Sequence, residues 1–217
     1  MDPATLVIVG LVIVTALTFD FTNGFHDTAN AMATSIATGA LKPKTAVIAA
    51  GTLNLVGAFL SVEVAKTISG GLINEQVVTI APEFILAGLI GAIIWNLLTW
   101  LVGLPSSSSH ALFGGLVGAV IIGAGVGGVN FAAVITKILV PALVSPIVAG
   151  VAAFCAVKLI FAVVKHMSEK QVESGFRHGQ TVTACLVALS HGTNDAQKTM
   201  GIITLTLIAV GLQPSGS

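Results

Sequence analysis

The sequence predicts an all-α, polytopic membrane protein, and three observations support this fold class. The 217 residues are 55% hydrophobic and only 8% charged, whereas a soluble domain carries about 25% charged residues. The stretches 45–62 and 138–157 contain no charged residue, and neither does the chain from Phe84 to Thr136. A spanning helix needs roughly 20 apolar residues, so these runs are long enough to cross a bilayer. They lack the alternation of barrel strands, and lipid requires internally bonded backbone, so helices are expected.

The apolar runs divide into eight predicted helical segments. The first lacks the basic leader of a secretory signal, so we expect it to be a retained helix. The long uncharged run must fold back at least once, and Gly103 to Pro105 is the expected bend. Pro141 and Pro146 are expected to kink or break the sixth segment. In chain order the segments are 4–22, 27–40 (short), 45–62, 83–103, 109–125, 136–164, 181–190 (short) and 196–212.

The few charges predict an orientation in the membrane. Nine basic residues balance nine acidic ones, so a nucleic-acid partner is not indicated. The polar segment 165–180 is basic, and basic loops stay in the cytoplasm. Lys42 and Lys44 indicate a second cytoplasmic end. The outer side is predicted for Asp2 and for the loop that carries Glu63, Glu75 and Glu83.

Two polar clusters resemble each other across the chain. Aligning Asp27 with Asp195 brings four further pairs into register: Gly24 with Gly192, Met32 with Met200, His26 with Asn194, and Asn30 with Lys198. Each cluster reads as the start of an apolar helix. Many transporters consist of repeats whose discontinuous helices meet near the bilayer midplane. The pattern therefore predicts an inverted-repeat transporter with broken or re-entrant helices.

The first cluster offers groups for both a cation and an anion. Asp27 and Asn30 share one helix face and supply the oxygen ligands that hard cations prefer. Free N–H groups at a helix start suit an oxyanion. His26 titrates near neutral pH. The alternative is structural, with Asp27 as an ordinary helix N-cap.

The other two clusters are also open to two interpretations. In 190–198, Asn194 and Asp195 precede Lys198, which either neutralises Asp195 or holds a substrate anion. In 103–112, four serines follow Pro105. Their hydroxyls can cap the next helix or donate to phosphate or sulfate oxygens. The segment is either a re-entrant hairpin tip or a polar turn at the membrane surface.

Three of these motifs together resemble the inorganic phosphate transporter (PiT) family, bacterial low-affinity type. They are GFHDTANAMAT, GLPSSSSHAL and SHGTNDAQKTMGII. The family signature G-A-N-D-V-A-N occurs twice. The first copy here matches at Gly24, Asp27, Ala29 and Asn30, and the second at Gly192, Asn194 and Asp195. The departures are similar to those of bacterial members assigned to proton-coupled transport.

The resemblance implies a site, a substrate and a location. Substrate-binding residues would be Asp27, Asn30, Ser107, Ser108, Ser109, Asn194 and Asp195; ion-coupling residues would be His26, Asp27 and Asp195. The substrate would be phosphate, carried as a neutral metal-phosphate with protons, or with sodium as the alternative. No bound cofactor or resident metal is implied. The location would be the plasma membrane of a bacterium or archaeon.

The resemblance also implies how the chain is organised. Residues 1–164 would form a first repeat, 165–180 a cytoplasmic linker, and 181–217 the start of a second repeat. Family members continue past the second signature, with a second serine hairpin. The resemblance therefore implies a C-terminal truncation, or a site completed by a homo-oligomer or a second chain.

Two other classes of function compete with a coupled transporter. An intramembrane serine hydrolase would use a serine of 106–109 with a histidine and an aspartate, but no G-x-S-x-G elbow is present. An enzyme is therefore not expected. A passive anion channel would also tolerate the buried carboxylates, although it needs no coupling groups.

Overall fold

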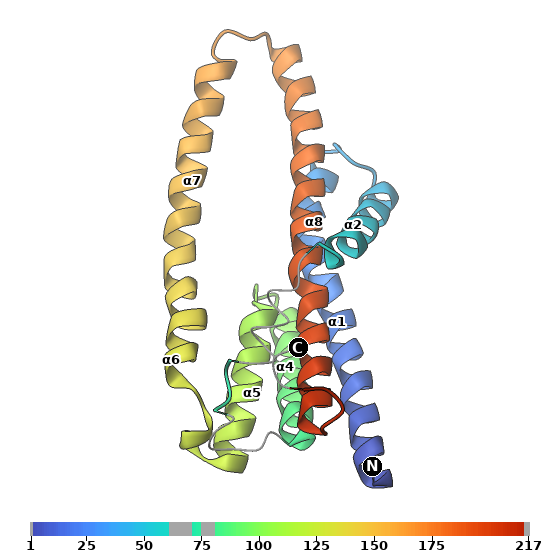
Figure 1. Cartoon of the computed structure of the whole chain (residues 1–217). Helices are drawn as coiled ribbons and strands as arrows, with labels where there is room; N and C mark the ends of the chain where they lie inside the picture. Colours follow the sequence, from blue (N-terminus) through green and yellow to red (C-terminus); the bar gives the residue numbers. More distant parts are fainter. Residues whose placement is uncertain (1, 61–70, 75–80, 215–217) are drawn as a thin grey trace.

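The computed structural model describes residues 2–60, 71–74 and 81–214, without the side chains of Phe25 and His26 (Figure 1). Strand pairing within these residues is limited to one isolated bridge, between Ile73 and Val129. The predicted all-α fold is confirmed. The helices are α1 (Pro3–Ala37), α2 (Pro43–Ala58), α4 (Pro82–Val102), α5 (Ser108–Ala124), α6 (Phe131–Val134), α7 (Val140–Val164) and α8 (Glu169–Ala209), with a 3-10 turn at Val126–Gly128 and a π-helical turn at Ile135–Leu139.

Among the described residues, three helical stretches are long and apolar enough to cross a membrane. They are Pro3–Ala37, Pro82–Val102 and Phe131–Val164. Proline stands in the first turn of α1, α2 and α4, where its missing N–H costs no helical hydrogen bond. These starts follow the predicted segments closely.

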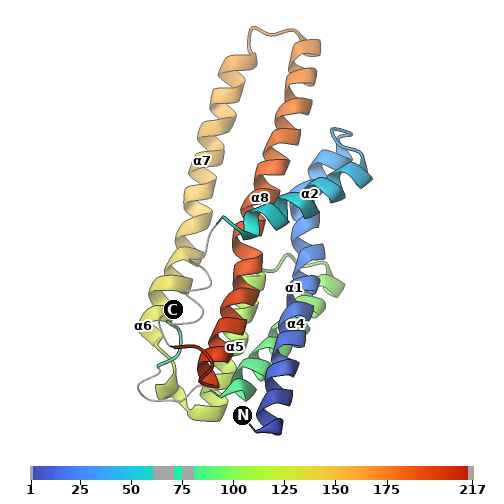
Figure 2. The same cartoon turned by 45° about the vertical axis from the view of Figure 1, so that its right-hand side comes forward.

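Helices α1 and α8 form the centre of the molecule. The two helices are in contact and antiparallel: in Figures 1 and 2, α1 rises from the N-terminus at the bottom of the view, and α8 descends from the top toward the C-terminus. The α4–α5 pair packs against one half of this central pair, and α2 packs against α8. The two signature copies therefore lie on neighbouring helices of opposite direction.

Both signature copies lie inside continuous helices, which differs from the predicted segments. Helix α1 runs through Asp27, and α8 runs through Asp195. The predicted boundaries after residue 22 and after residue 190 are absent. Asp27 therefore does not cap a helix. Polar side chains can gather on one face of a helix without interrupting its backbone, and both signature copies do so.

Helices α4 and α5 form the predicted hairpin. Gly103 ends α4 with a φ of 72°, a left-handed conformation that glycine adopts readily. Leu104 N–H then bonds to Thr99 O at 2.9 Å. The two helices approach closely at Gly88, where an added Cβ would lie 2.9 Å from the Cα of Leu116. The hairpin tip carries the serines into the helical bundle.

Two apolar clusters hold these helices together. The larger joins α1, α4, α5 and α8; the smaller joins α1, α2 and α8 and consists mainly of alanines. Small residues let helix backbones approach closely, as membrane helices require. The larger cluster contains Val12, Ala16, Phe19, Ile85, Leu89, Ala92, Leu112, Leu116, Ile202 and Leu205.

The predicted linker 165–180 is mostly helical. Only residues 165–168 connect α7 to α8, and α8 begins at Glu169. Ser168 N–H donates to Gln171 Oε1 at 3.1 Å, which is half of a capping box. This connection and the α1–α2 connection lie toward one end of the molecule, and the N-terminus toward the other (Figure 1). Glu63 and Glu75 lie outside the described residues, and the predicted sidedness stays a prediction.

Pro141 and Pro146 do not break the predicted segment 136–164. A π-helical turn at Ile135–Leu139 comes directly before Pro141, and such turns absorb local disruptions of helical bonding. Pro146 lies inside α7. No residue of α7, which is described throughout, is buried by the rest of the described chain. Within the described part of the chain, its apolar surface is therefore uncovered.

Candidate functional site

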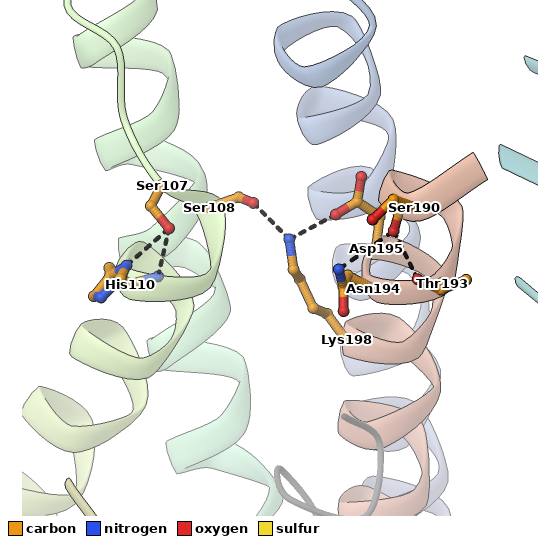
Figure 3. Close-up of polar contacts among 8 residues, drawn as sticks. All are labelled: Ser107, Ser108, His110, Ser190, Thr193, Asn194, Asp195 and Lys198. Carbon is orange, nitrogen blue, oxygen red and sulfur yellow. Dashed lines mark hydrogen bonds and ion pairs between the residues drawn. The ribbon is translucent and has the colours of Figure 1, made fainter. Parts of the chain in front are cut away.

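The serine tip of the α4–α5 hairpin begins the candidate site. Ser107 is the N-cap of α5, and its Oγ accepts the His110 N–H at 3.4 Å and lies 2.8 Å from His110 Nδ1. Ser108, in the first turn of α5, is buried and points across to α8 (Figure 3). The capping interpretation is thus correct for Ser107, whereas the depth of this tip in the membrane stays a prediction.

Lys198 links this tip to the second signature copy (Figure 3). Its Nζ donates to Ser108 Oγ at 2.7 Å and to Asp195 Oδ1 at 2.8 Å. The side chains of Lys198 and Asp195 are 4% and 13% exposed. A buried charge persists only when it is paired and hydrogen-bonded, and this ammonium meets both conditions. Of the two roles left open for Lys198, ion pairing with Asp195 is present.

A cavity of about 530 Å³ opens beside this link. It brings together carboxylates from α1 and α8, hydroxyls from the hairpin tip, and a buried ammonium. A phosphate ion with its first waters fits such a volume, because pockets for small molecules begin near 300 Å³. The lining residues are Asp27, Ser107, Ser108, Ser109, Phe113, Lys137, His191, Asn194, Asp195 and Lys198.

A second cavity of about 500 Å³ adjoins the same aspartates. Asp27 and Asp195 line both cavities. The polar residues that line only the second one include Asp20, Asn23 and Asn54. Asn23 is 1% exposed, and neither polar atom of its amide has a hydrogen-bond partner. The second cavity therefore adds Asp20 and two amides to the pair of aspartates that it shares with the first.

The structure brings most of the predicted site residues together. Asp27, Ser107, Ser108, Ser109, Asn194 and Asp195 all line the first cavity. Asn30 does not: it is exposed and lines neither cavity. The side chain of His26 lies outside those that the structure describes. Asn194 also donates from Nδ2 to Ser190 O, at 3.3 Å.

The two cavities also have polar lining residues that were not predicted as site residues. His191 and Lys137 line the first cavity, and Asp20 and Asn23 the second. Asp20 precedes Asp27 by two helical turns, so both fall on one face of a continuous helix. The spacing of Asp20 and Asp27 was present in the sequence. Because 4–22 and 27–40 were predicted as separate segments, the two aspartates were not placed on one helix face.

A cavity lined by charged and hydroxyl groups, set among apolar helices long enough to cross a bilayer, defines a membrane transport protein. The model of the phosphate transporter family matches residues 23–216, and the chain belongs to this family. It is a membrane protein of a family of transporters rather than enzymes, which removes the serine hydrolase alternative. The resemblance inferred from the three motifs is confirmed.

Three relatives show how far the similarity extends. Proteins described as a "Probable low-affinity inorganic phosphate transporter" are 56% identical in Mycobacterium tuberculosis (strain ATCC 25618 / H37Rv) and 45% identical in Bacillus subtilis (strain 168). The matches cover 93% and 98% of this chain, but 48% and 63% of those proteins. The chain thus spans about half the length of the mycobacterial relative. A shorter relative from Streptomyces halstedii is 44% identical over 88% of this chain and 89% of its own length.

A solved structure has the same fold. It is described as "The sodium-dependent phosphate transporter" and matches with a TM-score of 0.86 at 22% sequence identity. The match covers 97% of this chain and 70% of the other. At this identity the match shows the fold alone, and the helices of this chain are arranged as in that structure.

Proposed function

We propose that this chain forms the substrate site of a secondary active transporter that carries inorganic phosphate by symport with protons. The observation that carries the proposal is the first cavity, in which hydroxyls and an ammonium face two carboxylates. An oxyanion needs donors, and a coupling cation needs acceptors. The cavity offers both kinds of group to ions bound side by side.

Phosphate would lie against the hairpin tip. Ser108 Oγ accepts a hydrogen bond from Lys198, which leaves its own O–H free to donate to a phosphate oxygen. Ser107 and Ser109 line the same cavity. The Lys198 ammonium, already between this tip and Asp195, adds attraction for an anion.

Protons and a divalent metal would lie toward the carboxylates. Asp27 and Asp195 line the cavity together with His191, and Asp and His side chains among membrane helices commonly form proton relays. We include His26 as a third coupling group on the grounds of its place beside Asp27. A neutral metal-phosphate costs far less to move through lipid than a phosphate dianion does. The cargo is therefore proposed to be phosphate paired with a divalent metal.

The transporting unit is proposed to contain more than one polypeptide, either two copies of this chain or this chain with a second one. The uncovered apolar surface of α7 supports this proposal, since such a surface suits another helix as well as it suits lipid. Crosslinking between single cysteines introduced on α7 in the native membrane would test it.

Uptake into proteoliposomes tests the coupling ion. With an inward proton gradient and Mg²⁺ present, radiolabelled phosphate is expected to accumulate above its external concentration, because the gradient supplies the free energy. A protonophore should stop accumulation, and replacing sodium with choline should not. Accumulation that requires sodium and ignores the protonophore would establish the sodium-coupled alternative. Flux that only equilibrates phosphate would establish a passive channel.

Substituting Ser108 with alanine is expected to weaken phosphate binding without unfolding the protein. The change removes one donor to phosphate, and Lys198 keeps its bond to Asp195. The apparent KM for phosphate should rise about 10-fold, the usual effect of losing a hydrogen bond to a charged group. Ser106→Ala is the matched control, because Ser106 Oγ accepts from Trp95 Nε1 at 3.1 Å on another side of the tip. An unchanged KM in Ser108→Ala would remove Ser108 from the site.

A further inference from the structure

The two signature copies differ in charge at one aligned position. Three residues after its aspartate, the first copy has the neutral amide of Asn30, and the second has the ammonium of Lys198. A residue three positions on shares a helix face with the aspartate. An uncharged amide in one copy thus corresponds to a fixed cation in the other.

The surroundings of Lys198 Nζ are those of a bound cation. The two oxygens that it contacts, 2.7 and 2.8 Å away, come from a hydroxyl on the hairpin and a carboxylate on α8. Hydroxyl and carboxylate oxygens are hard ligands, the kind that alkali and alkaline-earth cations take. The side chain is 4% exposed, so the ammonium is not a surface charge that merely lies near a carboxylate.

The carboxylates around the two cavities indicate why an ammonium is needed at this position. Asp20, Asp27 and Asp195 all line one or both cavities. A carboxylate that loses its buried partner is strongly destabilising, and more so among membrane helices. Without the Lys198 ammonium, Asp195 would have to bind a proton or another cation in the same place.

We propose that the Lys198 ammonium takes the place of a bound monovalent cation. With a neutral side chain at this position, a monovalent cation from solution would bind there instead. The residue would then determine whether the second signature copy uses sodium. The part of the inference that concerns sodium coupling rests on the proposed symport of phosphate. The part that concerns cation binding does not depend on it.

Thermal unfolding of the purified protein in sodium chloride and in choline chloride of equal ionic strength tests the binding. The wild-type Tm is expected to be the same in both salts. Lys198→Asn shortens the side chain and supplies an amide oxygen, so its Tm should be roughly 5 °C higher in sodium, as expected for a ligand well above its Kd. Lys198→Met supplies no such ligand, and its Tm should be lowered equally in both salts.

Lys137→Asn is the matched control. Lys137 lines the same cavity but is exposed, and its replacement should create no response to sodium. The inference is overturned if Lys198→Asn responds to sodium no more than the wild type does. It is also overturned if the variant fails to fold even in sodium, because the cation from solution would then not replace the ammonium.

Uptake measurements separate this inference from the proposed function. If the wild type carries phosphate, Lys198→Asn uptake should require sodium, whereas wild-type uptake should not. If the wild type carries no phosphate, the proposed function fails, and the sodium-dependent Tm of Lys198→Asn still decides the inference.

Discussion

Replacing Asp27 with asparagine is expected to reduce coupled phosphate uptake at least ~100-fold, equivalent to about 3 kcal/mol, because it removes one of the two carboxylates that line the first cavity. Asp27 lines both cavities together with Asp195, and it is the carboxylate that α1 contributes to the first cavity. Asparagine keeps the shape and removes the charge. The initial rate of radiolabelled phosphate uptake into proteoliposomes measures the effect.

Asp2→Asn is the control for this substitution. Asp2 precedes α1, is exposed, and makes no side-chain capping bond, so uptake should be unchanged. Because α1 continues through Asp27, a capping role cannot explain a loss of uptake in Asp27→Asn. Wild-type uptake in that variant would contradict the proposed coupling role.

Replacing Gly192 with alanine is expected to destabilise the protein by about 1–3 kcal/mol or more, the usual cost of overpacking. Helices α2 and α8 cross here with their backbones in contact. A Cβ on Gly192 would lie 2.6 Å from the Cα of Asn54. Backbone cannot rotate away as a side chain does, so α2 must move. The measured quantities are Tm and the fraction of monodisperse protein on size-exclusion chromatography.

Gly179→Ala is the matched control on the same helix. A Cβ on Gly179 meets nothing within 4 Å, and alanine favours a helix over glycine by about 1 kcal/mol. This variant should be at least as stable as the wild type. Equal stability of the two variants would show that the α2–α8 contact is not as close as described. Gly192→Ala should also slow uptake, because Gly192 lines the second cavity.

The sequence predicted the cavity better than it predicted the helix ends. Asp27, Asp195 and the serine tip were expected to meet, and all three line the first cavity. These residues could be predicted as site residues because clusters of charged and hydroxyl groups are rare in apolar runs. Polar clusters also occur at helix ends, and so both signatures were assigned to helix starts. In the structure, these polar residues instead face a neighbouring helix and a cavity within continuous helices. A local sequence pattern does not contain information on such tertiary contacts.

The misplaced start of α8 had a different cause. The segment after Ser168 is rich in charged and polar residues, with few apolar ones such as Val172 and Phe176, so its composition favours a linker. The sequence nevertheless contained a helix signal, since Ser168 and Gln171 have the spacing of a capping box, and Gln171 Oε1 does accept the Ser168 N–H. For Asn30 no comparable signal existed. Its distance from Asp27 along the helix was known, but the side that α8 covers was not.

The lengths of α1 and α8 have a consequence for the surrounding lipid. At 1.5 Å per residue, the 35 residues of α1 extend about 52 Å, whereas the hydrocarbon layer is about 30 Å thick. Such mismatch is relieved by tilting, by local thickening of the bilayer, or by projection into water. Because α1 and α8 are packed together and each holds an aspartate of the site, they must adjust as one unit. Bilayer thickness therefore acts directly on the helix pair that carries the site.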